Sequence, residues 1–214
     1  MAKRILNMTA EEMTHAAKSE LIEAIAGSEG RVLASETIGI TIPLLTDVTN
    51  AEFAASMGAD LILLNMFDVQ EPKIMALPEV EKEETVREVK RLTGRMVGIN
   101  LEPVEESYAS DNKETLWEMS AGRYATVENA IQAQKMGVDL IVLTGNPGNG
   151  VSNPAIISSL KAISEAVGEK IMLAAGKMHA SGIIGEGGEN IITKEDIRQF
   201  AEAGAAIILL AAPG

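Results

Sequence analysis

The chain has 214 residues and no cysteine, which excludes disulfides and thiolate-bound zinc and favours a reducing, cytoplasmic location. Aromatic residues make up only 3%, so the stacking surfaces of a single-strand nucleic-acid binder are missing. Basic residues are also few, and a net charge of −13 disfavours nucleic-acid binding. No run approaches the roughly 20 apolar residues of a membrane helix, and the amino terminus lacks the apolar core of a signal peptide. We therefore expect neither membrane insertion nor secretion.

Six short apolar runs recur along the chain. They are continuous rather than alternating, as in LILLN at 61–65 and LIVLT at 140–144. Continuous runs of this length are typical of parallel strands that are covered on both faces. The strands are expected at residues 31–36, 60–65, 96–101, 139–144, 170–175 and 206–211.

Helical segments with apolar spacing near 3.6 residues lie between these runs. The segments that begin at Thr9 and Thr193 each place a hydroxyl three residues ahead of an acidic side chain, which is a helix-start pattern. Helices are expected at residues 49–57, 78–92, 126–136, 154–167 and 193–203, with one more helix at 9–26 before the first strand.

An internal repeat connects a helix to the strand that follows it. MGADLILL starts at residue 57, MGVDLIVL at 136 and AGAAIILL at 203, and the glycine of each copy can take the left-handed conformation that ends a helix. The third copy has Ala206 where the others have Asp60 and Asp139. We therefore interpret these two carboxylates as features of the turn and not as catalysts.

Strands that alternate with helices predict an α/β fold of the (β/α)8 TIM-barrel type, with six of eight β/α units in this chain. Residues 1–214 would form a single barrel domain that is incomplete at its carboxyl end, and 9–26 would cap the amino-terminal mouth. The six units leave three alternatives: a fragment, which we favour, a ring completed by a partner chain, or an open doubly wound sheet. Unpaired edge strands would promote association, so we expect a homo-oligomer.

Ligand sites in such folds lie beyond the carboxyl ends of the strands. Glu36, Asp68 and Glu102 could converge there on a divalent cation or divide the roles of acid and base, and Asp68 and Glu102 are the candidate ligands of Mg²⁺ or Mn²⁺. Alternatively, these carboxylates only cap the helices that follow them. The residues that we expect to bind substrate are Asn65, Asn100, Thr144, Asn146, Gly148 and Gly187.

Two further catalytic candidates follow the fifth strand in LAAGKMHAS. Lys177 could form a Schiff base or hold an anionic group, and His179 could act as an acid, a base or a metal ligand. A hydrogen-bonding role for His179 is the alternative. The other histidine, His15, lies in the leading helix, and we expect it to be exposed.

Two glycine-rich stretches, 144–154 and 182–193, precede helices whose amino ends could bind phosphate. Neither matches the P-loop pattern, and a plain flexible loop is the alternative. The long segment 103–124 holds Trp117 and both tyrosines, and it could act as a lid or simply pack onto the barrel.

The combination of RILNMTAEE, DVTNAEFAASMGADLILLNMFDV, TGNPGNGVSNP and GKMHASGIIGEGG resembles an uncharacterised bacterial TIM-barrel family, whose members are labelled haloacid dehalogenase-like hydrolases or phosphonomutase-like proteins. The resemblance covers the whole chain, and it implies longer members. The dehalogenase label requires an Asp-x-Asp motif after the first strand, whereas Asp47 and Asp68 are single. We expect an enzyme of lyase, aldolase, isomerase or hydrolase type acting on a small anionic or phosphorylated metabolite. A non-catalytic ligand-binding or regulatory barrel, or an inactive fragment, is the alternative.

Overall fold

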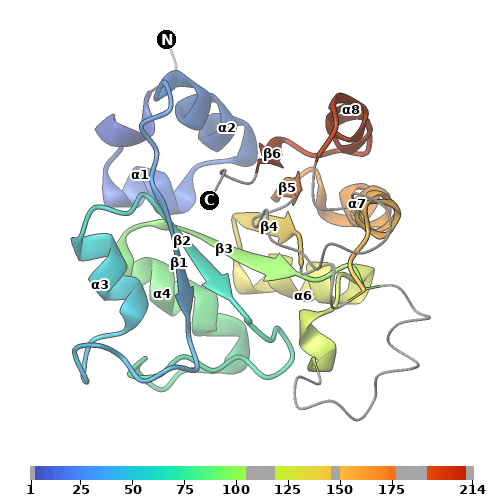
Figure 1. The fold of residues 1–214 in the computed structure, drawn as a ribbon. Helices are drawn as coiled ribbons and strands as arrows, with labels where there is room; N and C mark the ends of the chain where they lie inside the picture. Colours follow the sequence, from blue (N-terminus) through green and yellow to red (C-terminus); the bar gives the residue numbers. More distant parts are fainter. Residues whose placement is uncertain (1–2, 105–118, 146–149, 177–191, 211–214) are drawn as a thin grey trace.

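The structure, a computed structural model, describes residues 3–104, 119–145, 150–176 and 192–210. Within these ranges six strands pair in chain order, each parallel to its neighbours, and form a curled sheet (Figure 1). A doubly wound sheet would reverse its strand order near the middle, so that alternative is wrong and the barrel-type arrangement is confirmed. The strands are β1 (Ala34–Ile38), β2 (Leu61–Asn65), β3 (Met96–Leu101), β4 (Leu140–Leu143), β5 (Met172–Gly176) and β6 (Ile207–Leu209).

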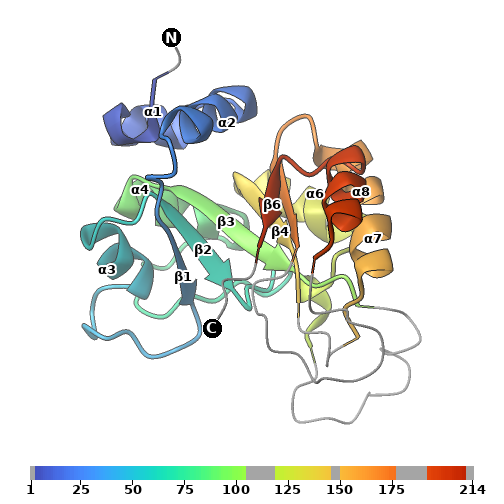
Figure 2. The ribbon, with the colours of Figure 1, turned by 45° about the horizontal axis from the view of Figure 1, so that its top comes forward.

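The helices alternate with these strands and lie on the outer side of the sheet (Figure 2). Both expected capping boxes are present, at Thr9 and at Thr193. The expected helix at 78–92 is shorter, because residues 78–81 are not helical and a 3₁₀ turn at 82–84 precedes the α-helix. These outer elements are α3 (Asn50–Ser56), η2 (Lys82–Glu84), α4 (Thr85–Thr93), η3 (Ala121–Arg123), α6 (Val127–Met136), α7 (Asn153–Val167) and α8 (Lys194–Glu202).

The leading segment, which the sequence predicts as one helix, forms two helices, α1 (Ala10–His15) and α2 (Lys18–Gly27), after the short turn η1 (Ile5–Asn7). The break lies at Ala17, whose ψ of 156° is extended and whose N–H donates to the carboxylate of Glu20 at 2.8 Å. This side-chain contact begins a new helix. Figure 2 shows both helices at the end of the sheet from which the strands run away.

Successive side chains along each strand point to opposite faces of the sheet, and this alternation separates two apolar clusters. Side chains of one parity, such as Ile62, Ile99 and Ile141, pack against the outer helices. Side chains of the other parity, such as Leu63 and Leu140, face the inside of the curl and pack with residues of η1, α1 and α2. The amino-terminal helices therefore cover the inner face at the amino ends of the strands.

The repeated turn has the same geometry in its two Asp-containing copies. Asp60 accepts the backbone N–H of Leu33 at 2.9 Å, and Asp139 accepts that of Val97 at 2.9 Å. In both copies the Asp stands opposite the residue whose N–H it accepts. Asp60 precedes Leu61, which pairs with Ala34, and Asp139 precedes Leu140, which pairs with Gly98. The structure supports the interpretation of both carboxylates as turn features.

Candidate functional site

Four of the expected site residues share the inner face of the sheet near the carboxyl ends of the strands. Glu36 stands opposite Leu63, which belongs to the inner cluster, and Asn100 stands opposite Val142, which belongs to the same cluster. Asn65 follows Leu63 by two residues and therefore has the same parity. Glu102 continues the alternation of β3. The topology thus places polar side chains from three neighbouring strands at one end of an otherwise apolar wall.

Glu36, Asn65 and Asn100 are connected through hydrogen bonds. The Asn65 Nδ2 donates to Glu36 Oε1 at 2.5 Å, across the pairing of β1 with β2. The backbone N–H of Met66 lies close to Asn65 Oδ1, at 2.8 Å, and to Asn100 Oδ1, at 3.2 Å. Glu36 is exposed and Asn100 is buried, so this polar row begins in solvent at β1 and continues into the sheet.

Met66 has a left-handed backbone with φ of 56°, although it is not a glycine. For an L-residue this conformation costs roughly 1–2 kcal/mol. The two amide oxygens that accept its N–H hold the residue in place. Sequence reasoning identified both asparagines but not this strained residue between them, because nothing in NMFD signals a positive φ.

Glu102 is bound to a residue that sequence reasoning missed. Its carboxylate accepts a hydrogen bond from Arg123 Nη2 at 2.5 Å, and the exposed fractions of the two side chains are 8% and 17%. The backbones of the two residues are also joined, because Glu102 N–H donates to the carbonyl of Arg123 at 2.8 Å. The second carboxylate oxygen, Oε2, lies near Gly145, where an added Cβ would come within 3.4 Å of it.

Asp68 lies next to this pair and organises the loop that carries Arg123. Its Oδ1 accepts the backbone N–H groups of Gln70 at 2.7 Å and Glu71 at 3.0 Å. Burial alone would raise the pKa of Asp68, but hydrogen bonds from Ser120 and these two amides, with the positive charge of Arg123, lower it overall. Asp68 is therefore a loop-organising carboxylate in this structure.

A buried asparagine on α6, Asn129, also holds η3 in place. Asn129 on α6 is 3% exposed and donates to the carbonyls of Ala121 at 2.8 Å and Tyr124 at 2.9 Å, while it accepts from Gln70 Nε2 at 3.0 Å. These bonds fix the turn from which Arg123 extends. The only sequence signal for Asn129 is a polar residue on the apolar face of a helix.

The described carboxylates do not form a metal centre. Among the residues with described positions, no group of three or more His, Cys, Asp or Glu side chains is arranged to hold a metal ion. Glu36 bonds to Asn65, Glu102 to Arg123, and Asp68 to backbone amides. Among the described residues, each of these three carboxylates therefore has its own partner within the protein, and a shared cation stays a prediction.

The remaining expected residues differ in how far they can be described. Thr144 is 4% exposed at the end of β4, next to Gly145. His15 is exposed, as expected. Trp117, residues 146–149 of the first glycine-rich stretch and residues 182–191 of the second lie outside the described residues. The other candidates also lie outside them: Asn146, Gly148, Lys177, His179 and Gly187.

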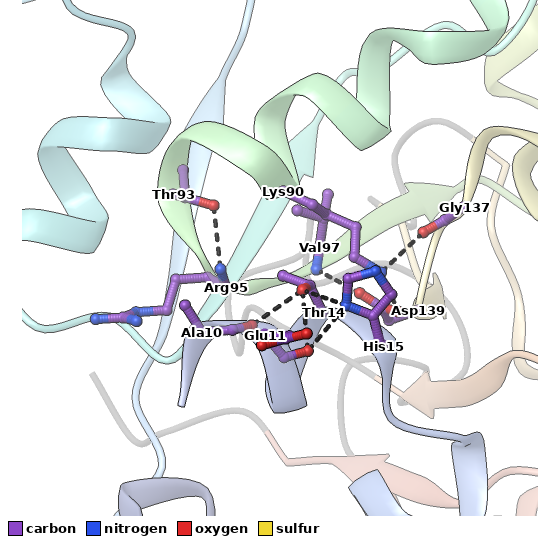
Figure 3. Close-up of polar contacts among 10 residues, drawn as sticks. All are labelled: Ala10, Glu11, Thr14, His15, Lys90, Thr93, Arg95, Val97, Gly137 and Asp139. Carbon is purple, nitrogen blue, oxygen red and sulfur yellow. Dashed lines mark hydrogen bonds and ion pairs between the residues drawn. The ribbon is translucent and has the colours of Figure 1, made fainter. Parts of the chain in front are cut away.

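The amino-terminal end of the sheet carries a different polar cluster, which Figure 3 shows. Lys90 Nζ extends from α4 to Asp139 Oδ1 at 2.7 Å, and the other oxygen of Asp139 accepts the Val97 N–H. Burial raises the pKa of Asp139, against the opposite effects of Lys90 and Val97. This ion pair joins α4 to the turn before β4, at the end of the sheet opposite to the Glu36 row.

Solved structures similar to this chain are TIM-barrel enzymes. The 2,3-dimethylmalate lyase, a member of the PEP mutase/isocitrate lyase superfamily, has a TM-score of 0.54 at 13% identity, over 96% of this chain and 63% of that one. Phosphonopyruvate hydrolase in complex with oxalate and Mg²⁺ has a TM-score of 0.50 at 15% identity, over 96% and 64%. The carboxyl transferase domain of pyruvate carboxylase from Rhizobium etli has 0.51 at 16%, over 93% and 30%.

These identities establish the fold alone, and the chain spans less than two thirds of the length of each of these three structures. The likeness to a PEP mutase superfamily member agrees with the phosphonomutase-like label, and the dehalogenase label has no support. Among the described residues, no helix is both long and apolar enough to cross a membrane.

A search of curated proteins gave no match. A protein family matches residues 6–214, which is nearly the whole sequence. The chain therefore belongs to the family described as "Domain of unknown function (DUF7916)".

Proposed function

We propose that this chain belongs to a barrel enzyme that acts on a small anionic metabolite by lyase, aldolase or isomerase chemistry. The observation that carries the proposal is the polar row of Glu36, Asn65 and Asn100 on the inner face, at the carboxyl ends of the strands. Barrel enzymes place their reacting groups at this end. The lyase and hydrolase named above share the fold, which supports the choice of chemistry by analogy.

Each residue of the row has a role that suits its surroundings. Glu36 is exposed and held by Asn65, so its free carboxylate oxygen can take or return a proton. Asn65 and Asn100 are fixed by the Met66 N–H and can orient polar groups of a substrate. Thr144, which follows β4, is the next polar residue along this end of the sheet and would also contact the substrate.

Five residues outside the described ranges complete the proposal. Lys177 would capture a carbonyl or hold an anion, and His179 would serve as acid or base. The other three, Asn146, Gly148 and Gly187, would contact the anionic part of the substrate, including any phosphate. The phosphonopyruvate hydrolase complex contains Mg²⁺, so Mg²⁺ and Mn²⁺ belong among the ligands to be tested.

A non-catalytic, ligand-binding barrel is the second candidate. It is favoured by the observation that Asp68 and Glu102 are already bonded to groups of the protein itself, which leaves Glu36 as the exposed carboxylate of the three. Both candidates require binding of a small anion, and only the enzyme requires turnover.

The first experiment measures thermal melting with oxalate, pyruvate, inorganic phosphate, sugar phosphates and phosphonates, each with and without Mg²⁺ or Mn²⁺. A ligand at 100 times its Kd stabilises the folded state by about 2.7 kcal/mol, which for a chain of this size raises the Tm by roughly 5–10 °C. Nuclear magnetic resonance of the incubated ligands then distinguishes turnover from binding.

Substitutions identify the site in the same assay. Glu36→Gln should abolish turnover while the ligand-induced rise in Tm persists. Glu29→Gln, at an exposed carboxylate paired with Arg31, is the matched control and should change neither. Trapping with borohydride and a carbonyl ligand should label wild-type protein and not Lys177→Ala. If no ligand raises the Tm of the wild-type chain, both candidate functions fail.

A further inference from the structure

The guanidinium of Arg123 uses only one of two adjacent N–H donors to bond to the carboxylate of Glu102. Nη2 donates to Glu102 Oε1, whereas the neighbouring donor, Nε, is buried and has no hydrogen-bond partner among the residues that the structure describes. Nε–H and the adjacent Nη2–H lie side by side on one edge of the guanidinium, and this edge can hold both oxygens of a carboxylate at once. Glu102 fills one of the two positions, and its other oxygen lies towards Gly145.

A buried donor without a partner destabilises the fold, because its hydration is lost and nothing replaces it. The surrounding structure nevertheless holds Arg123 in this position. Its carbonyl accepts Glu102 N–H, its turn is fixed by Asn129, and Asp68 lies beside it. The arrangement is therefore an ordered cation with one hydrogen-bonding position open, located beside Glu102 at the carboxyl end of β3.

We propose that Arg123 is the carboxylate receptor of the site and that Glu102 is an internal competitor, which occupies part of the receptor in the free protein. A small carboxylate ligand would displace Glu102 and bond to Nε and Nη2 together. This inference rests on the proposed function, because it assumes a small anionic ligand, and it narrows the ligand class to carboxylates.

Competition predicts opposite effects for the two members of the pair. Arg123→Gln removes the charged donor pair and should weaken oxalate binding by roughly ten- to hundredfold, as expected for charge-assisted hydrogen bonds. Glu102→Gln removes the competing charge and should strengthen oxalate binding. A merely structural ion pair would give effects of the same sign, because either substitution breaks it.

The experiment is isothermal titration of the full chain with oxalate in the presence of a chelator, with inorganic phosphate as the comparison. Arg123→Lys keeps the charge but not the planar donor pair, and it should bind oxalate less tightly than wild type and more tightly than Arg123→Gln. Arg91→Gln and Glu88→Gln are matched controls, since Arg91 and Glu88 form an ion pair of 2.7 Å on α4 in which Arg91 is exposed. Neither control should alter binding.

The outcomes separate this inference from the function on which it rests. If phosphate or sugar phosphates bind and oxalate does not, or if Arg123→Gln binds oxalate as wild type does, the carboxylate receptor is wrong and the proposed function stands. If no anion binds, both are wrong. If Arg123→Gln does not fold, Glu102→Gln decides: tighter oxalate binding supports the receptor, and unchanged or weaker binding overturns it.

Discussion

Lys90 and Asp139 form a 2.7 Å ion pair whose side chains are only 12% and 11% exposed (Figure 3). The pair joins α4 to the turn that begins β4, two elements almost 50 residues apart in the chain. Because Asp139 also accepts the Val97 N–H, a single carboxylate connects a helix, a turn and a strand.

Asp139→Ala should strongly destabilise the fold, since it leaves the buried Lys90 charge and the Val97 N–H without their partner. We expect a loss of about 3–5 kcal/mol in the free energy of unfolding, measured by urea denaturation. Asp60→Ala is the control, because Asp60 makes the same backbone contact in the first copy of the turn, and its loss should be about 1 kcal/mol. Equal losses would show that the ion pair adds nothing to the turn.

Glu12 should make the stability of the amino-terminal helices depend on pH. A hydrogen bond from Lys3, followed by the backbone and side-chain hydrogen bonds of Thr9, lowers the pKa of Glu12 from 4.5 to about 2. Because the folded pKa is below the unfolded one, this contribution is present above pH 4.5 and is lost as the pH falls towards 2. Melting temperatures between pH 6 and 2 should fall less steeply in Glu12→Gln and in Lys3→Met. A wild-type slope in both variants would contradict this assignment.

Gly122→Ala should disturb the loop that carries Arg123, because an added Cβ would lie 1.8 Å from Asp68 Oδ1 and 2.8 Å from the Gln70 nitrogen. Such overpacking destabilises by about 1–3 kcal/mol, and the displaced Arg123 should also bind oxalate more weakly. Gly58→Ala tests the backbone alone, since Gly58 has φ of 101° and open space around it. It should lower the Tm without changing ligand affinity, and a matching loss of affinity would remove Gly122 as a specific determinant.

Asn129→Asp keeps the volume of the side chain but cannot donate to the carbonyls of Ala121 and Tyr124. We expect a loss of about 1–3 kcal/mol and faster amide hydrogen exchange in the turn before α6. Gln70→Ala removes one bond to the same asparagine, from a partly exposed pair, and should have a smaller effect. Unchanged exchange in Asn129→Asp would mean that other contacts hold η3.

Much of the fold follows from local sequence patterns. Continuous runs such as LILLN predicted the six parallel strands, and helix starts such as Thr193 were visible because a hydroxyl and a carboxylate three residues apart satisfy the first free amides. The observed strand limits differ from the expected ones where pairing with a neighbouring strand sets them. For example, β1 was expected at 31–36 but spans Ala34–Ile38, because its pairing with β2 begins at Ala34 and Leu61. The break at Ala17 was missed for a similar reason, because it depends on one contact with Glu20.

The candidate site was predictable only in part. Position near the carboxyl end of a strand identified Glu36, Asn65 and Asn100, because parallel strands bring these ends together. The same reasoning placed Asp68 and Glu102 at that end. It could not tell that backbone amides would bind Asp68 and that Arg123 would bind Glu102. Arg123 lies 21 residues after Glu102, so no spacing rule links the two.

The sequence by itself determined the six parallel strands, helix starts such as Thr9 and Thr193, and the two Asp turns, because hydrophobic periodicity and capping act over a few residues. The tertiary structure alone decided which polar groups meet: the row from Glu36 to Asn100, and the half-filled edge of Arg123. These contacts depend on the path of each loop between a strand and the next helix, and packing over the whole chain sets that path.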